Sequence, residues 1–85
     1  ISNSGETEEV IRLIPYIKRF NIKLISLTRP NSTLAYASDV VIDVSVKKEA
    51  CDTLSVPTAS TTATLAMGDA IAVALLTKRG LKEED

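Results

Sequence analysis

The sequence predicts an α/β fold in which a doubly wound parallel sheet carries helices on both faces. Strand-like and helix-like segments alternate along the chain, which is typical of parallel sheets covered by helices. The apolar residues between positions 23 and 28 are too continuous for a half-exposed strand and indicate a buried parallel one. Ile1, which a helical pattern follows, resembles the last residue of a further strand.

A helix of about four turns is expected after residue 7, because apolar side chains recur there at helical spacing. They are Val10, Leu13, Ile14, Ile17 and Phe20. Pro15 lies inside this helix and removes one backbone hydrogen bond. We therefore expect a kink near residues 11 to 15 rather than two separate elements, and an end at Asn21.

A βαβ unit is expected next. Its first strand covers residues 23 to 28, Asn31 or Ser32 caps a short helix that runs to about Ala37, and the second strand covers residues 40 to 44. In doubly wound sheets, ligands collect at the carboxyl ends of the strands. Three loops should lie at that edge: residues 2 to 7, 29 to 32 and 45 to 60.

The last helix is expected over about residues 60 to 79, after a long irregular segment, and it stops at Gly80. Its middle is apolar on nearly every face, so one face should pack on the sheet. Another face should need a partner from further sequence or from another subunit. We interpret Gly68 as a close helix contact and Asp69 as a satisfied structural carboxylate.

Composition limits the classes of function. The 85 residues, 45% of them hydrophobic and 25% charged, fit one small globular domain. Ten Lys and Arg against eleven Asp and Glu give no electrostatic case for nucleic acid or an anionic membrane, and no apolar run is expected to span a bilayer. Cys51 is the one cysteine, which fits a reducing cytosol, and we expect a buried, inert thiol. The absence of His excludes a His-based metal site within these residues.

The stretch from residue 2 to residue 7 is the candidate ligand loop. It combines three hydroxyls, an amide, a glycine and a carboxylate: Ser2, Asn3, Ser4, Gly5, Glu6 and Thr7. Glycine lets a backbone approach a ligand, while hydroxyls and helix N–H groups bind anions, so the stretch has the outline of a phosphate cradle. A helix start capped by Ser4 explains the same residues equally well. The expected place of the loop at the carboxyl edge favours the ligand interpretation.

Five stretches carry a resemblance to a known family. They are Ser-Asn-Ser-Gly-Glu-Thr at 2 to 7, Leu-Ile-Pro at 13 to 15, Lys-Glu-Ala-Cys at 48 to 51, Pro-Thr-Ala-Ser-Thr-Thr-Ala-Thr-Leu at 57 to 65 and Met-Gly-Asp-Ala at 67 to 70. With them the chain resembles the second half of a sugar isomerase (SIS) domain, and closely its arabinose-5-phosphate isomerase branch. The first stretch marks the wider domain, and its combination with the third and fourth is specific to the branch. The resemblance implies that residues 1–85 belong to one three-layer α/β/α domain of flavodoxin-like or Rossmann-like architecture, incomplete in this chain.

The resemblance also implies an activity, the interconversion of D-arabinose 5-phosphate and D-ribulose 5-phosphate for the synthesis of Kdo, a sugar of Gram-negative lipopolysaccharide. Such a reaction passes through a cis-enediol and needs an acid–base group, but in principle no metal or organic cofactor. A carboxylate whose pKa an enclosed site raises could serve. By resemblance, Glu6 and Glu49 match the carboxylates that carry out the acid–base work in the family. For Glu6, stabilisation of the helix dipole is nearly as good an explanation; for Glu49, the residues alone favour a solvated loop charge.

The remaining site residues also follow from the resemblance. Ser2, Asn3, Ser4 and Thr7 match positions that hold the sugar phosphate, and Ser60 and Thr61 match positions near the sugar chain. The expected partner is a phosphorylated sugar, and we expect a cytoplasmic homo-oligomer with no nucleic-acid or membrane partner.

Two family segments are not in this sequence: a Gly-rich loop with Lys and Ser would precede Ile1, and a His-Pro-Gly-Gly segment would follow Asp85. We therefore expect the 85 residues alone to be inactive and assign the activity to the complete protein. Residues 52 to 56, Asp-Thr-Leu-Ser-Val, also differ from the family's usual Pro-Leu-Gly-Leu-Ala. Two alternatives remain, a non-catalytic sugar-phosphate sensor and a structural fragment whose apolar faces a partner covers.

Overall fold

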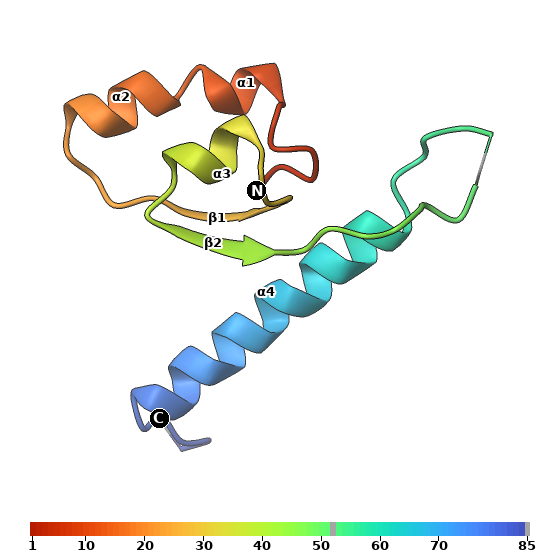
Figure 1. Cartoon of the computed structure of the whole chain (residues 1–85). Coiled ribbons are helices and arrows are strands. Elements are labelled where there is room, and N and C mark those ends of the chain that lie inside the picture. The colour runs from red at the N-terminus through yellow and green to blue at the C-terminus, as the bar shows by residue number, and fades with distance from the viewer. Residues whose placement is uncertain (52, 85) are drawn as a thin grey trace.

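The computed structural model describes residues 1–51 and 53–84 and has the predicted α/β alternation (Figure 1). The elements in chain order are α1 (Glu8–Ile11), α2 (Ile14–Arg19), β1 (Ile25–Thr28), α3 (Thr33–Ala37), β2 (Val40–Asp43) and α4 (Ala59–Lys78). Strands β1 and β2 pair in parallel, from Ile25 opposite Val40 to Thr28 opposite Asp43. Ser2 joins the other edge of β1 through a parallel bridge to Thr28, so β1 lies between two parallel neighbours. The expected α/β class with a parallel sheet is confirmed.

The first helical region differs from the expectation in one respect. The single kinked helix is wrong, because α1 and α2 are separate short helices that meet at residues 12 and 13. Pro15 has no N–H with which to continue the helical ladder, and Leu13 N instead bonds Val10 O at 3.1 Å in a tighter turn. The predicted end at Asn21 is confirmed. Its φ of 54° and the bond from Ile22 N to Ile17 O, 3.1 Å long, close the helix in a Schellman motif.

The βαβ unit has the predicted elements in the predicted order. Ser32 caps α3, since its Oγ accepts a hydrogen bond from Ala35 N at 3.2 Å. Where α3 returns to the sheet, the Asp39 carboxylate accepts a hydrogen bond from Leu24 N at 2.8 Å. That bond is the main cause of a lowered Asp39 pKa. The Ser32 cap fixes the loop at the carboxyl end of β1, while the Asp39–Leu24 bond joins the amino ends of β1 and β2.

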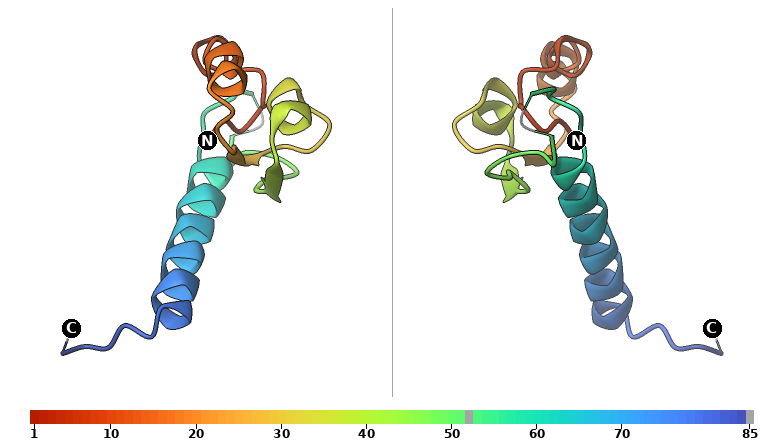
Figure 2. Two further views of the ribbon diagram at one scale, coloured as in Figure 1. Left: turned by 90° about the vertical axis from the view of Figure 1, so that its left-hand side faces the viewer. Right: turned by 90° about the vertical axis from the view of Figure 1, so that its right-hand side faces the viewer.

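Helices α1, α2 and α3 lie on one side of the sheet, and α4 lies on the other and diverges from it toward its C-terminal end (Figures 1 and 2). A stripe of α4 is half-buried or buried at helical spacing: Ser60, Ala63, Thr64, Met67 and Ile71. Apart from the half-buried Ala59, the other residues of α4 are exposed, including Leu65, Val73, Leu75 and Leu76. The expectation of one covered and one bare apolar face is thus met only in part, because every residue of the covered stripe except Ser60 is only half-buried. The expected close contact at Gly68 is wrong for this chain, since nothing among the described residues lies within 4 Å of a methyl group placed there.

Helix α4 also corrects the expectation about membranes. It has 20 residues and is long and apolar enough, by length and composition alone, to cross a bilayer. The expectation that no apolar run reaches that length is therefore wrong. One such helix is weak evidence for a membrane span, because core helices of large domains pass the same test.

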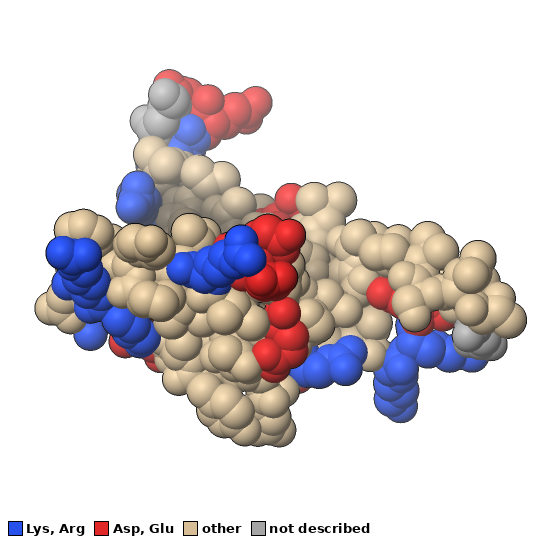
Figure 3. Space-filling model, turned by 90° about the horizontal axis from the view of Figure 1, so that it is seen from above, with Lys and Arg blue, Asp and Glu red and all other residues tan. Residues whose placement is uncertain are grey.

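The described residues bury little apolar surface among themselves. Leu34, Ala35 and Val44 are the buried apolar side chains, while the fully buried side chains are the hydroxyls Thr28 and Ser26. The radius of gyration is 15.2 Å, against about 12 Å for a compact domain of this length. Basic and acidic side chains both occur on the face over α1 and α2 (Figure 3). Arg12 and Glu8 form an exposed ion pair at 2.6 Å. The order in this chain therefore depends strongly on hydrogen bonds around β1.

Candidate functional site

A cavity of 790 Å³ lies at the carboxyl end of β1. It is lined by residues of the three loops expected at this edge: residues of the stretch 2 to 7, Arg29 after β1, and residues 46 to 49, Ser55 and Pro57 after β2. The first turns of α4 close a further side with Ser60, Thr61, Thr64, Leu65, Gly68 and Asp69. The sequence thus predicted correctly which segments meet here.

Hydrogen bonds within the chain hold the loop of residues 2 to 7. Ser2 is buried, its Oγ accepts from Gly5 N at 3.1 Å, and it shares a hydrogen bond with Thr7 Oγ1 at 2.7 Å. Thr28 Oγ1 donates to Ser2 O at 2.5 Å, and Leu34 N donates to Gly5 O at 3.0 Å. The hydroxyls of Ser2 and Thr7 are therefore engaged in shaping the loop.

The other two predicted phosphate residues have more capacity for a ligand. Ser4 is exposed, and its Oγ accepts from Glu6 N at 3.0 Å, which leaves its O–H proton available to an anion. Asn3 is half-buried, and its Oδ1 has no hydrogen-bond partner among the described residues. All four predicted phosphate residues, Ser2, Asn3, Ser4 and Thr7, line the cavity.

Gly5 has a different role from the one expected. Its φ is +71°, and a Cβ placed on it would lie 1.9 Å from Ser32 Oγ and 2.8 Å from Thr28 Oγ1. Gly5 is itself buried, so its backbone approaches the start of α3 and the end of β1. The missing side chain is needed for packing within the chain, and this close approach does not require a ligand.

Glu6 points to α3. Its Oε2 accepts a hydrogen bond from Thr33 N at 2.9 Å, and the hydrogen bonds from Thr33 lower the pKa of Glu6. Glu6 is not among the described residues that line the cavity. It braces the loop against α3 in this arrangement.

Glu49, in contrast, lines the cavity and meets the start of α4. Its Oε1 accepts hydrogen bonds from Thr58 N at 3.2 Å and Ser60 N at 2.9 Å, and its Oε2 accepts one from Ser60 Oγ at 2.5 Å. These bonds, the Ser60 hydroxyl first, lower the pKa of Glu49. The expectation of a carboxylate with a raised pKa is therefore wrong for both Glu6 and Glu49 in this chain, because N–H and O–H donors stabilise the charged form.

The α4 side of the cavity holds the remaining predicted residues. Ser60 is buried against Glu49, while Thr61 is exposed and its Oγ1 donates to Thr58 O at 2.9 Å. Asp69 is exposed at the cavity and has no hydrogen bond or ion pair with any residue in the described ranges. The expectation that Asp69 is a satisfied structural carboxylate is wrong here.

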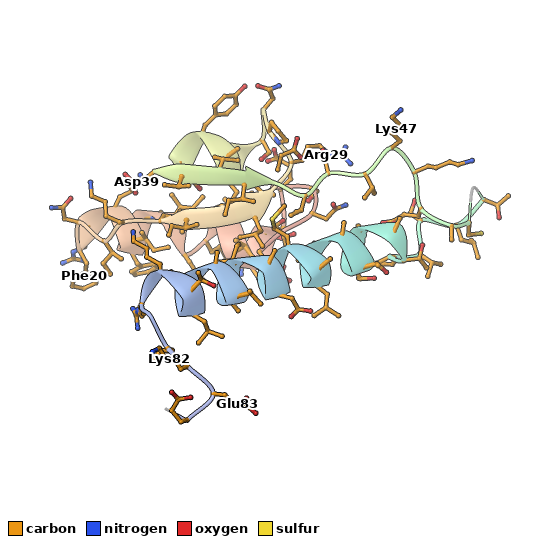
Figure 4. All side chains as sticks on the ribbon, turned by 90° about the horizontal axis from the view of Figure 1, so that it is seen from below. Phe20, Arg29, Asp39, Lys47, Lys82 and Glu83 are labelled. Carbon is orange, nitrogen blue, oxygen red and sulfur yellow. The ribbon has the colours of Figure 1, made fainter. Side chains whose placement is uncertain are left out.

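Two cavity-lining cations were not singled out from the sequence, Arg29 and Lys47. Arg29 follows β1 and Lys47 lies on the segment after β2, at the same end of the molecule (Figure 4). Lys48 lines the cavity as well. Arg29 could have been predicted from the sequence, because it directly follows a predicted strand, at the edge of the sheet where ligands are expected.

Cys51 does not fit the expectation of a buried, inert thiol. It is partly exposed, and a hydrogen bond with the Thr53 hydroxyl lowers the pKa of its thiol. It is not among the described residues that line the cavity. In residues 1–51 and 53–84, no group of three or more His, Cys, Asp or Glu could hold a metal ion. Asp52, at the start of the stretch that departs from the family pattern, lies outside the described residues.

Comparison with known proteins identifies the family. The family model described as SIS domain matches residues 1–74. The chain belongs to the SIS domain family. The matched part of this SIS domain includes the candidate loop, Glu49 and most of α4, so α4 is an integral helix of the domain.

Curated relatives are named arabinose 5-phosphate isomerase KdsD. The protein of Escherichia coli O157:H7 is 58% identical over 86 residues, which cover 100% of this chain and 26% of that protein. The Pseudomonas aeruginosa protein is 54% identical with the same coverage. The chain thus spans about a quarter of the length of these relatives.

A solved structure is also similar. The chain matches E. coli CFT073 c3406, solved in complex with a sugar phosphate, with a TM-score of 0.92 and 38% sequence identity, over 98% of this chain and 45% of that one. The arrangement of the SIS domain segment therefore recurs in a protein whose structure holds a ligand of the expected class.

Proposed function

We propose that the complete protein containing this segment is an arabinose 5-phosphate isomerase, which interconverts D-arabinose 5-phosphate and D-ribulose 5-phosphate. The observation that carries the proposal is that a hydroxyl-rich loop and the Glu49 carboxylate line one cavity at the carboxyl edge of the sheet. The similarity to KdsD proteins over the whole chain supports the choice of substrate. The pathway implied is the cytoplasmic synthesis of Kdo.

The loop of residues 2 to 7 would hold the phosphate. Ser4 offers a free O–H proton to the phosphate. Asn3 at the cavity wall could bind the phosphate only through its side-chain N–H groups, because its unpartnered Oδ1 is an acceptor and suits a sugar hydroxyl instead. Arg29 and Lys47 add positive charge near the same cavity, which complements a phosphate dianion. Ser2 and Thr7 contribute by keeping the loop in shape.

Glu49 would move the proton. Isomerisation requires a proton to leave one carbon and to return to its neighbour, so a carboxylate at the cavity wall can serve as base and then as acid. Glu6, the second carboxylate that the resemblance implies, would have to leave Thr33 to reach the cavity. The geometry therefore favours Glu49 as the group that this segment supplies.

The test is a coupled isomerase assay on the complete protein with a panel of aldose and ketose phosphates. Arabinose 5-phosphate should be the preferred aldose, and Glu49→Gln should lower kcat about 10²- to 10⁴-fold, with a smaller effect on binding. Glu9→Gln is the matched control, because Glu9 is exposed in α1 away from the cavity. Sugar-phosphate binding without turnover would support a sensor instead, and unchanged turnover in Glu49→Gln would remove Glu49 from the mechanism.

A further inference from the structure

The start of α4 holds Glu49 with three hydrogen bonds. Two backbone N–H groups, of Thr58 and Ser60, donate to Oε1, and the Ser60 hydroxyl donates to Oε2. Ser60 is only 3% exposed and is the buried residue of α4. Ser60 lines the cavity, but its hydroxyl proton is donated to Glu49, so it is not available to donate to a sugar in the role that the resemblance implies.

The two carboxylate oxygens are not equivalent in this arrangement. Each has two lone pairs that can accept hydrogen bonds. Oε1 receives two donors and is filled, whereas Oε2 receives one. The Ala59 N–H also lowers the pKa of Glu49, but among the described residues only the Ser60 hydroxyl makes a hydrogen bond to Oε2. Oε2 can therefore accept a further partner, and Glu49 lines the cavity.

We infer that Ser60 is a positioning residue, which fixes Glu49 so that Oε2 is the oxygen that exchanges a proton with the sugar. This inference rests on the proposed isomerase function. The proton of the C–H bond next to the carbonyl passes to Oε2, the electron pair of that bond forms the C=C bond, and the carbonyl π pair moves to oxygen to give the enediolate. The hydroxyl proton of the neighbouring carbon then passes to the enediolate oxygen, the new C=O bond forms there, and the proton on Oε2 is delivered to the former carbonyl carbon. These transfers restore the Glu49 carboxylate, so no further reactant is needed.

The electrostatic surroundings agree with this role. The N–H groups at the start of a helix favour a negative charge, and the donors from α4 lower the pKa of Glu49, so the carboxylate is ready to accept a proton. The other charged groups at the cavity are Arg29 after β1, Lys47 and Lys48 on the following segment, and Asp69 on α4. Replacing Ser60 alters none of these charged groups. A change in the titration of the Glu49 carboxyl would therefore report the loss of the Ser60 hydroxyl.

The experiment compares Ser60→Ala with the control Thr62→Ala in the complete protein. Thr62 lies on the same turn of α4, is exposed and is not among the described residues that line the cavity. Ser60→Ala should lower kcat about 10- to 100-fold, the effect of losing a hydrogen bond to a charged group. KM should change little, and the acidic limb of the kcat profile should move to higher pH. Thr62→Ala should change none of these quantities.

A double mutant separates positioning from a general structural role. Because Ser60 acts through Glu49, Ser60→Ala should lower kcat no further in the Glu49→Gln background. Ser60→Cys keeps a side chain of similar volume with a weaker hydrogen-bond donor. It should therefore lower kcat and shift the acidic limb in the same direction but by less. This variant replaces Ser60→Ala as the test if the alanine variant does not fold. A raised KM with an unchanged kcat and acidic limb would overturn the inference in favour of a direct sugar contact, and so would equal losses in Thr62→Ala.

Titration of the Glu49 carboxyl carbon by NMR tests the contact without any turnover. Ser60→Ala should raise the pKa of this carboxyl, and an unchanged titration would overturn the inference. If the unaltered protein isomerises no sugar phosphate, the proposed function fails, and the titration still decides whether Ser60 holds Glu49.

Discussion

Replacing Gly5 by alanine should loosen the loop of residues 2 to 7 from β1 and α3. The added Cβ would lie 1.9 Å from Ser32 Oγ, 2.3 Å from Ser32 Cβ and 2.8 Å from Thr28 Oγ1, and Gly5 has a φ of +71°. The left-handed backbone costs an alanine about 1 kcal/mol, and a methyl group forced into a packed site costs about 1–3 kcal/mol. The expected loss of unfolding free energy is therefore about 2–4 kcal/mol, a large fraction of the stability of a typical domain.

The assay is guanidinium unfolding of the complete protein, with Gly80→Ala as the control. Gly80 has a φ of +68° but nothing within 4 Å of an added Cβ, so its substitution should carry the backbone cost alone, about 1 kcal/mol. Ser32→Gly should rescue Gly5→Ala because it removes both close Ser32 atoms, while glycine at a helix cap costs only a few tenths of a kcal/mol. Ser32→Ala leaves Cβ at 2.3 Å and should rescue much less. Equal destabilisation in Gly5→Ala and Gly80→Ala, or no rescue by Ser32→Gly, would refute this reasoning.

Three further predictions concern the loop, acid stability and the helix break. Ser4→Ala should raise KM for the sugar phosphate about 10-fold with little change in kcat, because it removes a neutral donor to a charged group; an unaltered KM would count against the cradle. The Asp39 pKa is lowered from 3.8, mainly by Leu24 N, so its stabilising effect is complete above that value and is lost as the pH falls through the lowered pKa. Urea unfolding of Asp39→Asn should therefore show a smaller loss between neutral pH and about pH 3 than the unaltered protein, and equal losses would contradict this account. Pro15→Ala restores an N–H that can bond Ile11 O, so the new amide at position 15 should be protected from hydrogen exchange; an unprotected amide would show that Pro15 does not cause the break.

Local signals explain what the sequence predicted well. Ser32, Asn21 and Gly80 end or begin helices through bonds to residues three to five positions away, so their effect can be read from neighbouring residues. The meeting of three loops at one edge follows from the parallel connection, because such a connection brings successive strand ends to the same side. The helix ends can thus be predicted from a few neighbouring residues. The shared position of the loops can be predicted from the rule that parallel strand connections are right-handed.

Contacts between distant residues could not be predicted in the same way. Glu49 reaches Ser60 across an irregular segment, and Glu6 reaches Thr33 from a loop 27 positions earlier. Each carboxylate has a lowered pKa because it happens to meet N–H and O–H donors, and composition does not encode that meeting. Asp69 shows the reverse case, since a polar residue in an apolar helix suggested a partner that the described residues do not supply.

The hydrogen bonds that shape the loop of residues 2 to 7 have a consequence for the kinetics of recognition. Gly5 N, Leu34 N and Thr28 Oγ1 fix the loop through partners in the same chain, so its conformational entropy is already lost on folding. A ligand that meets such a preorganised surface need not order it, and association then depends on diffusion and charge. Sugar phosphates of different length should therefore bind with similar association rates and differ in how long they stay.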